Sequence, residues 1–239
     1  MSKTSNFDPK AYWSATLRLL AMTLAINNPD LRILWFTPDE SHPFLIQKMA
    51  CMHFGLDQEA VEKMAQDTKG KKKLGLFVEG LSNLKVCEDG SYDTVLKAID
   101  QASREWGEKP HVMVFDYADL FEPPMASGET MLKHKMEWFK RTAKTMGVGM
   151  ILLHQAKKSA IRGSAAQDPS MEDLDTAGHK EATLILWCRM TPARTQSEKL
   201  RHKLHPTMEV WVMKNKWQPN RPTDPLVLHL EAGGRLRSA

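Results

Sequence analysis

The sequence has few cysteines and no long apolar run, and both absences exclude classes of protein. Its 239 residues include three cysteines, an odd and widely spaced set that argues against a disulfide framework or a cysteine-based zinc site. No apolar run reaches the roughly 18 residues that a membrane-spanning helix needs, and the start lacks the charged-then-apolar pattern of a signal peptide. We therefore expect a cytoplasmic protein without a membrane partner.

The charge is modest in total but unevenly distributed. The formal net charge is +4 at pH 7, and 42% hydrophobic with 26% charged residues is an ordinary composition for a globular chain. Basic residues gather in four short stretches, at residues 71–73, 157–162, 199–203 and 214–221. A cluster of this kind is usually a solvated surface, so nucleic-acid binding needs a second signal.

Short apolar runs alternate with amphipathic segments along the chain. We expect strands at residues 31–37, 74–79, 111–116 and 147–155, and helices at 12–26, 44–54, 56–65, 94–106 and 129–146. Asp8 followed by Pro9 is a signal for the start of the first helix. The alternation predicts an α/β fold with a mainly parallel sheet flanked by helices.

The C-terminal third is richer in strands. Apolar runs at residues 183–188, 208–213 and 226–230 predict additional edge strands beside the parallel sheet. The sequence contains neither an internal repeat nor a linker-like stretch. We therefore expect one domain over residues 1–239.

Polar residues follow several of the predicted strands. In an open parallel sheet, ligands bind beyond the carboxyl ends of the strands, and these ends meet at one edge. The residues expected there are Asp39, Glu40, Asp116, Asp119, His154 and Gln155, with Lys214 and Lys216 following a later strand.

Several of these segments resemble the RecA-like core of DnaB-type replicative helicases. Residues 112–120, Val-Met-Val-Phe-Asp-Tyr-Ala-Asp-Leu, are similar to the Walker B segment of that family. Residues 35–41, Trp-Phe-Thr-Pro-Asp-Glu-Ser, resemble the segment with the catalytic glutamate, which places Asp39 at that position. Residues 147–155 resemble the strand that ends in Ser-Gln, with His154 replacing Ser and Gln155 as the phosphate sensor. The segments occur in the family's order over most of the chain.

The resemblance implies a ring, usually a hexamer, with active sites between subunits and DNA in its channel. Lys214 and Lys216 match a Lys-x-Arg segment that reaches a neighbouring subunit's nucleotide, although Lys at the second position weakens bidentate phosphate contact. The stretch after Gln155 matches a channel-facing loop, which implies DNA contacts for Lys157, Lys158 and Arg162. The chain is also similar to standalone DnaB-like proteins of mycobacteriophages that include structure-specific nucleases, which implies a host bacterial cytoplasm.

The phosphate-binding loop of such proteins has no match in this sequence. A working loop reads Gly-x-x-x-x-Gly-Lys-Ser/Thr, and its backbone N–H groups cradle phosphates. Residues 3–5, Lys-Thr-Ser, lie too far before Asp39 to be a remnant of the phosphate-binding loop. Lys10 lies near the spacing expected between the loop's lysine and the acid at the end of the next strand. There, Pro9 removes a backbone donor and Ala11 replaces the magnesium-binding hydroxyl. We therefore expect Lys10 at the cofactor position but no tight ATP site.

The acidic residues at the strand ends leave three functions open. Carboxylates with an imidazole bind hard metals and cleave phosphodiesters in two-metal sites. Our leading hypothesis is a metal-dependent DNA nuclease, in which Asp39, Asp116 and Asp119 hold Mg²⁺ or Mn²⁺ while Glu40 or His154 activates water. The alternatives are an ATP-dependent DnaB-like helicase or ATPase core and a non-catalytic DNA-binding replication accessory. Each predicts forked or single-stranded DNA as the partner.

Overall fold

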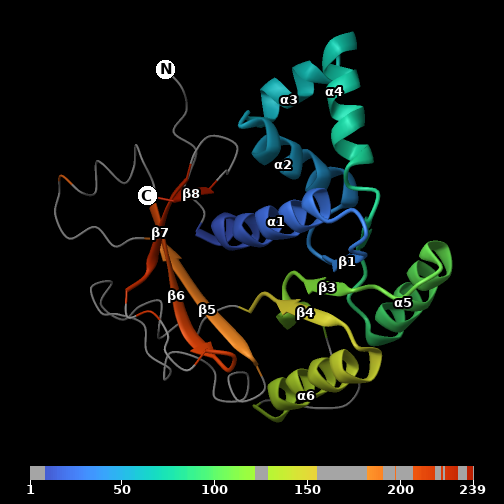
Figure 1. The fold of residues 1–239 in the computed structure, drawn as a ribbon, viewed down its shortest axis with the longest axis vertical. Helices are drawn as coiled ribbons and strands as arrows, with labels where there is room; N and C mark the ends of the chain where they lie inside the picture. The colour runs from blue at the N-terminus through green and yellow to red at the C-terminus, as the bar shows by residue number, and fades with distance from the viewer. Residues whose placement is uncertain are drawn as a thin grey trace.

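The strands of the computed structural model lie in two separate four-stranded sheets (Figure 1). The structure describes residues 9–121, 129–154, 182–190, 197, 207–218, 222, 224–230 and 236–238. The first sheet is parallel, in the order β2-β1-β3-β4, and consists of β1 (Ile33–Phe36), β2 (Leu84–Cys87), β3 (Val112–Phe115) and β4 (Gly149–Leu152). The second is antiparallel and consists of β5 (Leu184–Met190), β6 (Thr207–Asn215), β7 (Leu226–Leu230) and β8 (Leu236–Ser238).

Helices cover both faces of the parallel sheet (Figure 1). One face carries α1 (Pro9–Asn27) and α2 (His42–Phe54), and α3 (Gln58–Met64) and α4 (Thr68–Glu79) pack beyond α2. The other face carries α5 (Tyr92–Trp106) and α6 (Glu129–Met146), and a short 3-10 helix, η1 (Ala118–Leu120), follows β3. No helix in these described ranges is long and apolar enough to cross a membrane.

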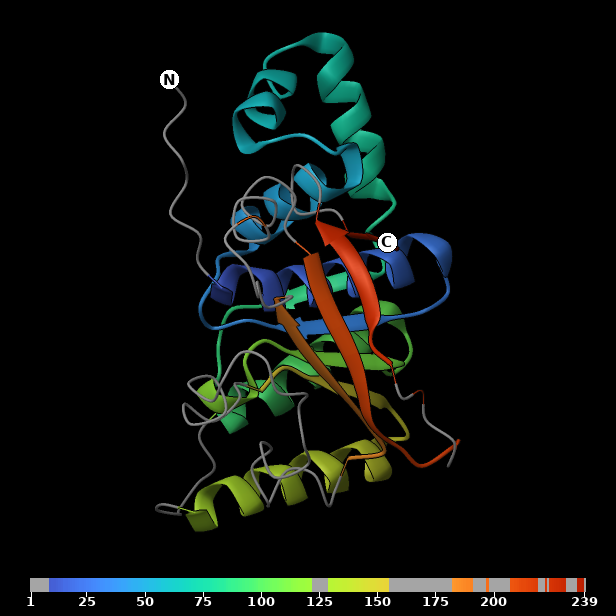
Figure 2. The same cartoon turned by 90° about the vertical axis from the view of Figure 1, so that its left-hand side faces the viewer.

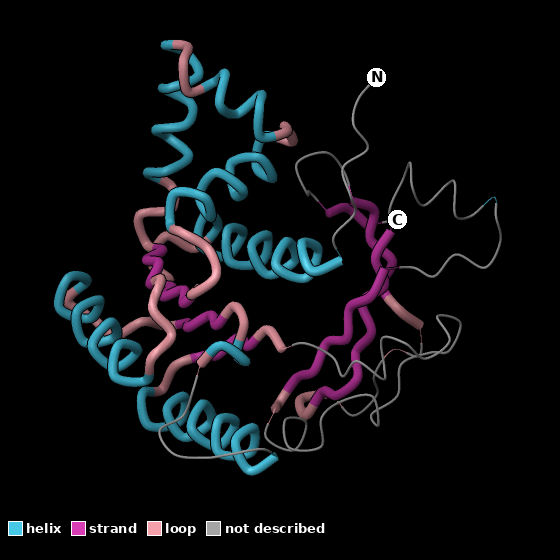
Figure 3. Tube along the Cα trace, turned by 180° about the vertical axis from the view of Figure 1, so that it is seen from behind, coloured by secondary structure: helices cyan, strands magenta, loops and turns pink. Residues whose placement is uncertain are grey.

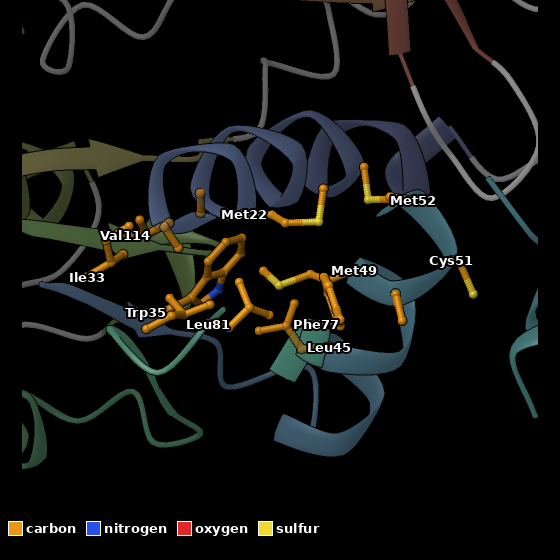
Figure 4. Close-up of a cluster of buried hydrophobic side chains, with 14 of the residues drawn as sticks. Met22, Ile33, Trp35, Leu45, Met49, Cys51, Met52, Phe77, Leu81 and Val114 are labelled. Atoms are coloured by element: carbon orange, nitrogen blue, oxygen red, sulfur yellow. The ribbon is translucent and has the colours of Figure 1, made fainter. Parts of the chain in front are cut away.

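The central strand β1 is buried on both faces because its side chains alternate between two cores. Ile33 and Trp35 pack against α1 and α2, and Figure 4 shows the Trp35 indole among methionine and leucine side chains. Leu34 and Phe36 point to the opposite face, toward α5 and α6. Complete burial of such side chains stabilises the fold by roughly 1.5–3 kcal/mol each. A continuous apolar run is therefore what this central parallel strand requires.

The expected α/β class is confirmed, but the C-terminal strands are arranged differently from the prediction. Instead of extending the parallel sheet, β5 to β8 form their own sheet. Among the described strands, none of the first sheet pairs with a strand of the second. Figure 2 shows this second sheet in front of α1. The two parts touch through α1, where the Thr16 hydroxyl lies 3.5 Å from the sulfur of Met208 in β6.

The strand predicted at residues 74–79 is wrong, because this stretch is the second half of α4. The Asp67 side chain caps the helix by accepting a hydrogen bond from the Gly70 N–H, at 2.9 Å. Gly70 and Phe77, seven residues apart, both face the interior, which is helical spacing. Figure 3 shows α3 and α4 as an arm at one end of the molecule. The edge strand β2, which our prediction missed, comes after this arm.

The buried amide of Asn83 links the end of α1 to β1. Its Nδ2 donates to the carbonyl oxygens of Ala25, Asn28 and Leu31 at 3.1, 2.9 and 2.9 Å. We predict that Asn83→Ala lowers the free energy of unfolding by about 2–3 kcal/mol, because buried carbonyls lose their donor. Urea denaturation measures this, and Asn28→Ala at an exposed side chain is the control, expected to cost at most about 1 kcal/mol. Equal losses in the two variants would contradict the role assigned to Asn83.

Two glycines of α4 are predicted to respond to alanine in opposite directions. A Cβ on Gly70 would lie 2.8 Å from the backbone C and Cα atoms of Met64 in α3, whereas one on Gly75 meets nothing within 4 Å. Gly70→Ala should lower the free energy of unfolding by about 1–3 kcal/mol through overpacking. Gly75→Ala should raise it by about 0.5–1 kcal/mol through helix propensity. Thermal denaturation of both variants checks the signs, and a stabilising Gly70→Ala would refute the close packing of α3 on α4.

Candidate functional site

The carboxyl ends of β1 and β3 place two buried polar residues side by side. In the parallel register Phe36 lies opposite Phe115, so Thr37 and Asp116 follow at the same edge. The Asp116 N–H donates to the Phe36 carbonyl at 2.9 Å, and the Asp116 residue is only 2% exposed. Thr37 is fully buried, and its N–H donates to the Cys87 carbonyl at 2.9 Å. Thr37 and Asp116 therefore form a buried polar layer beneath the more exposed residues of this edge.

Asp119 and His154 form the closest acid–imidazole contact at this edge. His154 Nδ1 lies 2.8 Å from Asp119 Oδ1, and both side chains are more than a third exposed. Their segments are held together because the Ala118 N–H donates to the Leu153 carbonyl at 2.7 Å. Lys135 of α6 donates to the Asp119 carbonyl at 2.9 Å. The carboxyl ends of β3 and β4 therefore meet, as predicted, at Asp119 and His154. Because Nδ1 of His154 contacts the Asp119 carboxylate, Nε2 on the far side of the ring is directed away from that carboxylate.

Glu40 belongs to a different cluster. Its Oε1 lies 2.6 Å from Arg18 of α1 and 2.5 Å from Lys48 of α2, and the Arg18 side chain is 5% exposed. Two cations thus hold the carboxylate, which ties α1 and α2 to the end of β1. This contact gives Glu40 a structural role and offers no support for the predicted activation of water.

The predicted metal site is not assembled in the described part of the chain. Asp39, Asp116 and Asp119 all lie within it, yet no three Asp, Glu, His or Cys side chains there come together as a group that could hold a metal ion. Asp39 is exposed, whereas Asp116 is buried beneath the edge. The acids of the predicted nuclease site thus occupy different layers of this edge.

Several predicted site residues lie outside what the structure describes. Gln155, Lys157, Lys158 and Arg162 are outside the described residues, so the predicted phosphate sensor and channel loop stay predictions. Lys10 lies in the first turn of α1, but its side chain is not described.

The start of α1 does not fit the phosphate cradle of the nucleotide that DnaB-type cores imply. The helix begins with Pro9, which has no N–H to donate, and Ala11 has no hydroxyl for a magnesium ion. The first turn of α1 therefore supplies neither the backbone donor nor the hydroxyl of a phosphate-binding loop at Pro9 and Ala11.

The cysteines offer no activated nucleophile. Burial raises the pKa of the Cys188 thiol to about 11, and burial also raises the pKa values of Cys51 and Cys87. Thiolates are the reactive form, so all three are poor nucleophiles at neutral pH.

Our sequence analysis missed two residues with distinctive environments. Arg18 is a buried cation paired with Glu40. The two residues meet only because α1 packs against the end of β1, so no local sequence pattern indicated their contact. Trp217 is 73% exposed immediately after Lys214 and Lys216, at the end of β6. An aromatic residue next to a basic cluster is a signal that the sequence did carry.

Comparisons with known proteins identify the fold. No protein-family model matches the chain, and no curated protein matches it in sequence. A solved DnaB-like replicative helicase, described with its interactions with primase, superposes with a TM-score of 0.73 at 15% identity, over 94% of this chain and 54% of that one. The chain thus spans about half the length of that helicase.

Two further structures agree. A solved ATPase domain has a TM-score of 0.73 at 16% identity, over 95% of this chain and 81% of that one. A KaiC-like protein from Pyrococcus horikoshii OT3 has a TM-score of 0.59 at 12% identity, over 95% and 84% of the two chains. The chain therefore shares its fold with these DnaB-like helicase, ATPase and KaiC-like structures.

Proposed function

We propose that this chain is the core of a DNA-acting motor of the DnaB type rather than a metal-dependent nuclease, and that its ATP phosphates are held by residues other than Pro9 and Ala11 of α1. The observation that carries the proposal is the superposition on a DnaB-like helicase and on a solved ATPase domain, each over at least 94% of the chain. Asp116 supports it, because a buried acid at the end of the central strand β3 stands where the resemblance puts the Walker B residue. The nuclease reading lacks comparable support, since the described acids form no group of three.

The same proposal gives roles to the basic residues. In a ring of subunits, Lys214 and Lys216 at the end of β6 reach toward a neighbouring subunit's nucleotide. Lys157, Lys158 and Arg162 contact DNA phosphates, which cations bind without reading sequence. A hexameric homo-oligomer on forked or single-stranded DNA is the assembly that we propose.

A second candidate is a non-catalytic DNA-binding component of the same fold. Pro9 and Ala11 at the start of α1 favour it, because they remove a phosphate donor and the magnesium-binding hydroxyl. Under this reading the protein binds DNA as a ring but hydrolyses no nucleotide.

One assay separates the motor from its alternatives. Purified protein is incubated with labelled forked DNA and Mg²⁺ or Mn²⁺, with and without ATP, while phosphate release and DNA products are measured. The motor predicts ATP hydrolysis that single-stranded DNA stimulates. We expect Asp116→Asn to lower this rate by about 10-fold to 100-fold, as is typical when a residue that positions a metal or its ligands is lost. Asp100→Asn, an exposed acid on α5, is the matched control and should leave the rate unchanged.

Each outcome favours one function. DNA binding with no ATP hydrolysis would replace the motor with the non-catalytic component. Cleavage of the labelled strand without ATP, abolished in Asp116→Asn, would restore the nuclease. Failure to bind forked or single-stranded DNA would contradict all three.

A further inference from the structure

The most exposed large apolar side chain in the described ranges stands beside two lysines. Trp217 is 73% exposed, more than any other large hydrophobic residue there. It follows Lys214, Asn215 and Lys216 at the end of β6. An exposed indole forgoes the stabilisation that its burial would supply, and its ring faces remain free to contact a ligand.

The turn that carries Trp217 is fixed by three hydrogen bonds. The Asn215 side-chain Oδ1 accepts from the N–H groups of Trp217 and Gln218 at 3.0 and 3.3 Å, which is an Asx-type turn. The Lys216 N–H donates to the Thr183 carbonyl at 2.9 Å, just before β5. The indole is therefore presented from an anchored backbone, and binding through it requires little ordering of the loop.

The neighbours of Trp217 suit a charged, planar ligand. Lys216 and Gln218, on either side of it, are both exposed, and Lys214 lies near the end of β6, two residues before Lys216. An aromatic face stacks on a nucleobase while an adjacent ammonium contacts the phosphate, the combination found on surfaces that bind single strands. An apolar protein partner would instead favour hydrophobic residues around the indole.

We propose that Trp217 is a stacking platform for an unpaired nucleobase of a bound single strand. This proposal rests on the proposed function, since it names how a DNA-acting core holds an unpaired strand. A free nucleotide also carries a nucleobase that can stack on Trp217, and the experiment separates a nucleotide from a DNA strand.

The test measures binding of a labelled single-stranded oligothymidylate by fluorescence anisotropy. Trp217→Ala should weaken binding by about 5-fold to 150-fold, the range that corresponds to the loss of one stacked base. Trp217→Phe keeps an aromatic face and should retain most of the affinity. Leu76→Ala, an exposed apolar residue on α4, is the control and should bind as the wild type does. An oligonucleotide of equal length with abasic sites should bind wild type and Trp217→Ala equally.

A second arm titrates ATP and adenosine in place of the oligonucleotide. A loss confined to this arm in Trp217→Ala would assign the platform to the free nucleotide. Equal affinity of wild type and Trp217→Ala in both arms would overturn the proposal while leaving the proposed function intact. A wild-type protein that binds none of these probes would overturn both. Circular dichroism of each variant confirms that the exposed substitution leaves the fold unchanged.

Discussion

The register between β1 and β3 determines where the polar residues of the candidate site lie. Phe36 faces Phe115 across the two strands, and their rings stack with centroids 4.7 Å apart. Such an aromatic pair contributes about 0.5–1.5 kcal/mol beyond the burial of its area. Because Thr37 and Asp116 follow these rings directly, a shift of register would move both away from the edge. The helices on both faces protect this register by burying the alternating side chains of β1.

The acidic side chains at this edge contact basic partners instead of gathering around one point. Glu40 is held by Arg18 and Lys48, and Asp119 is paired with His154. A buried Arg–Glu contact is costly to break, because the remaining charge would be left without a partner in a low dielectric. A two-metal nuclease needs several carboxylates around one point, and the acids of the described residues form no such group.

The sequence predicted the elements whose signals are local. Residues 111–116 and 129–146 matched observed elements because a buried strand and an amphipathic helix each carry their own periodicity. Residues 74–79 were predicted as a strand because apolar residues such as Leu76 and Val78 recur at every second position. In the structure this stretch belongs to α4, which leaves both side chains exposed. The Arg18–Glu40 pair and the separation of the two sheets depend on contacts between distant segments, which no local pattern encodes.

The proposed function requires that this fold, shared with a DnaB-like helicase, binds DNA through clustered cations and one exposed aromatic residue. The most direct test is the salt dependence of single-stranded DNA affinity, measured without ATP or divalent metal. Counterion release predicts that the logarithm of the association constant falls linearly with the logarithm of salt concentration, with a slope of about −0.7 per phosphate contacted. Measurable binding with a slope corresponding to several phosphates would support the account. An affinity that does not change with salt, or no binding at low salt, would contradict it.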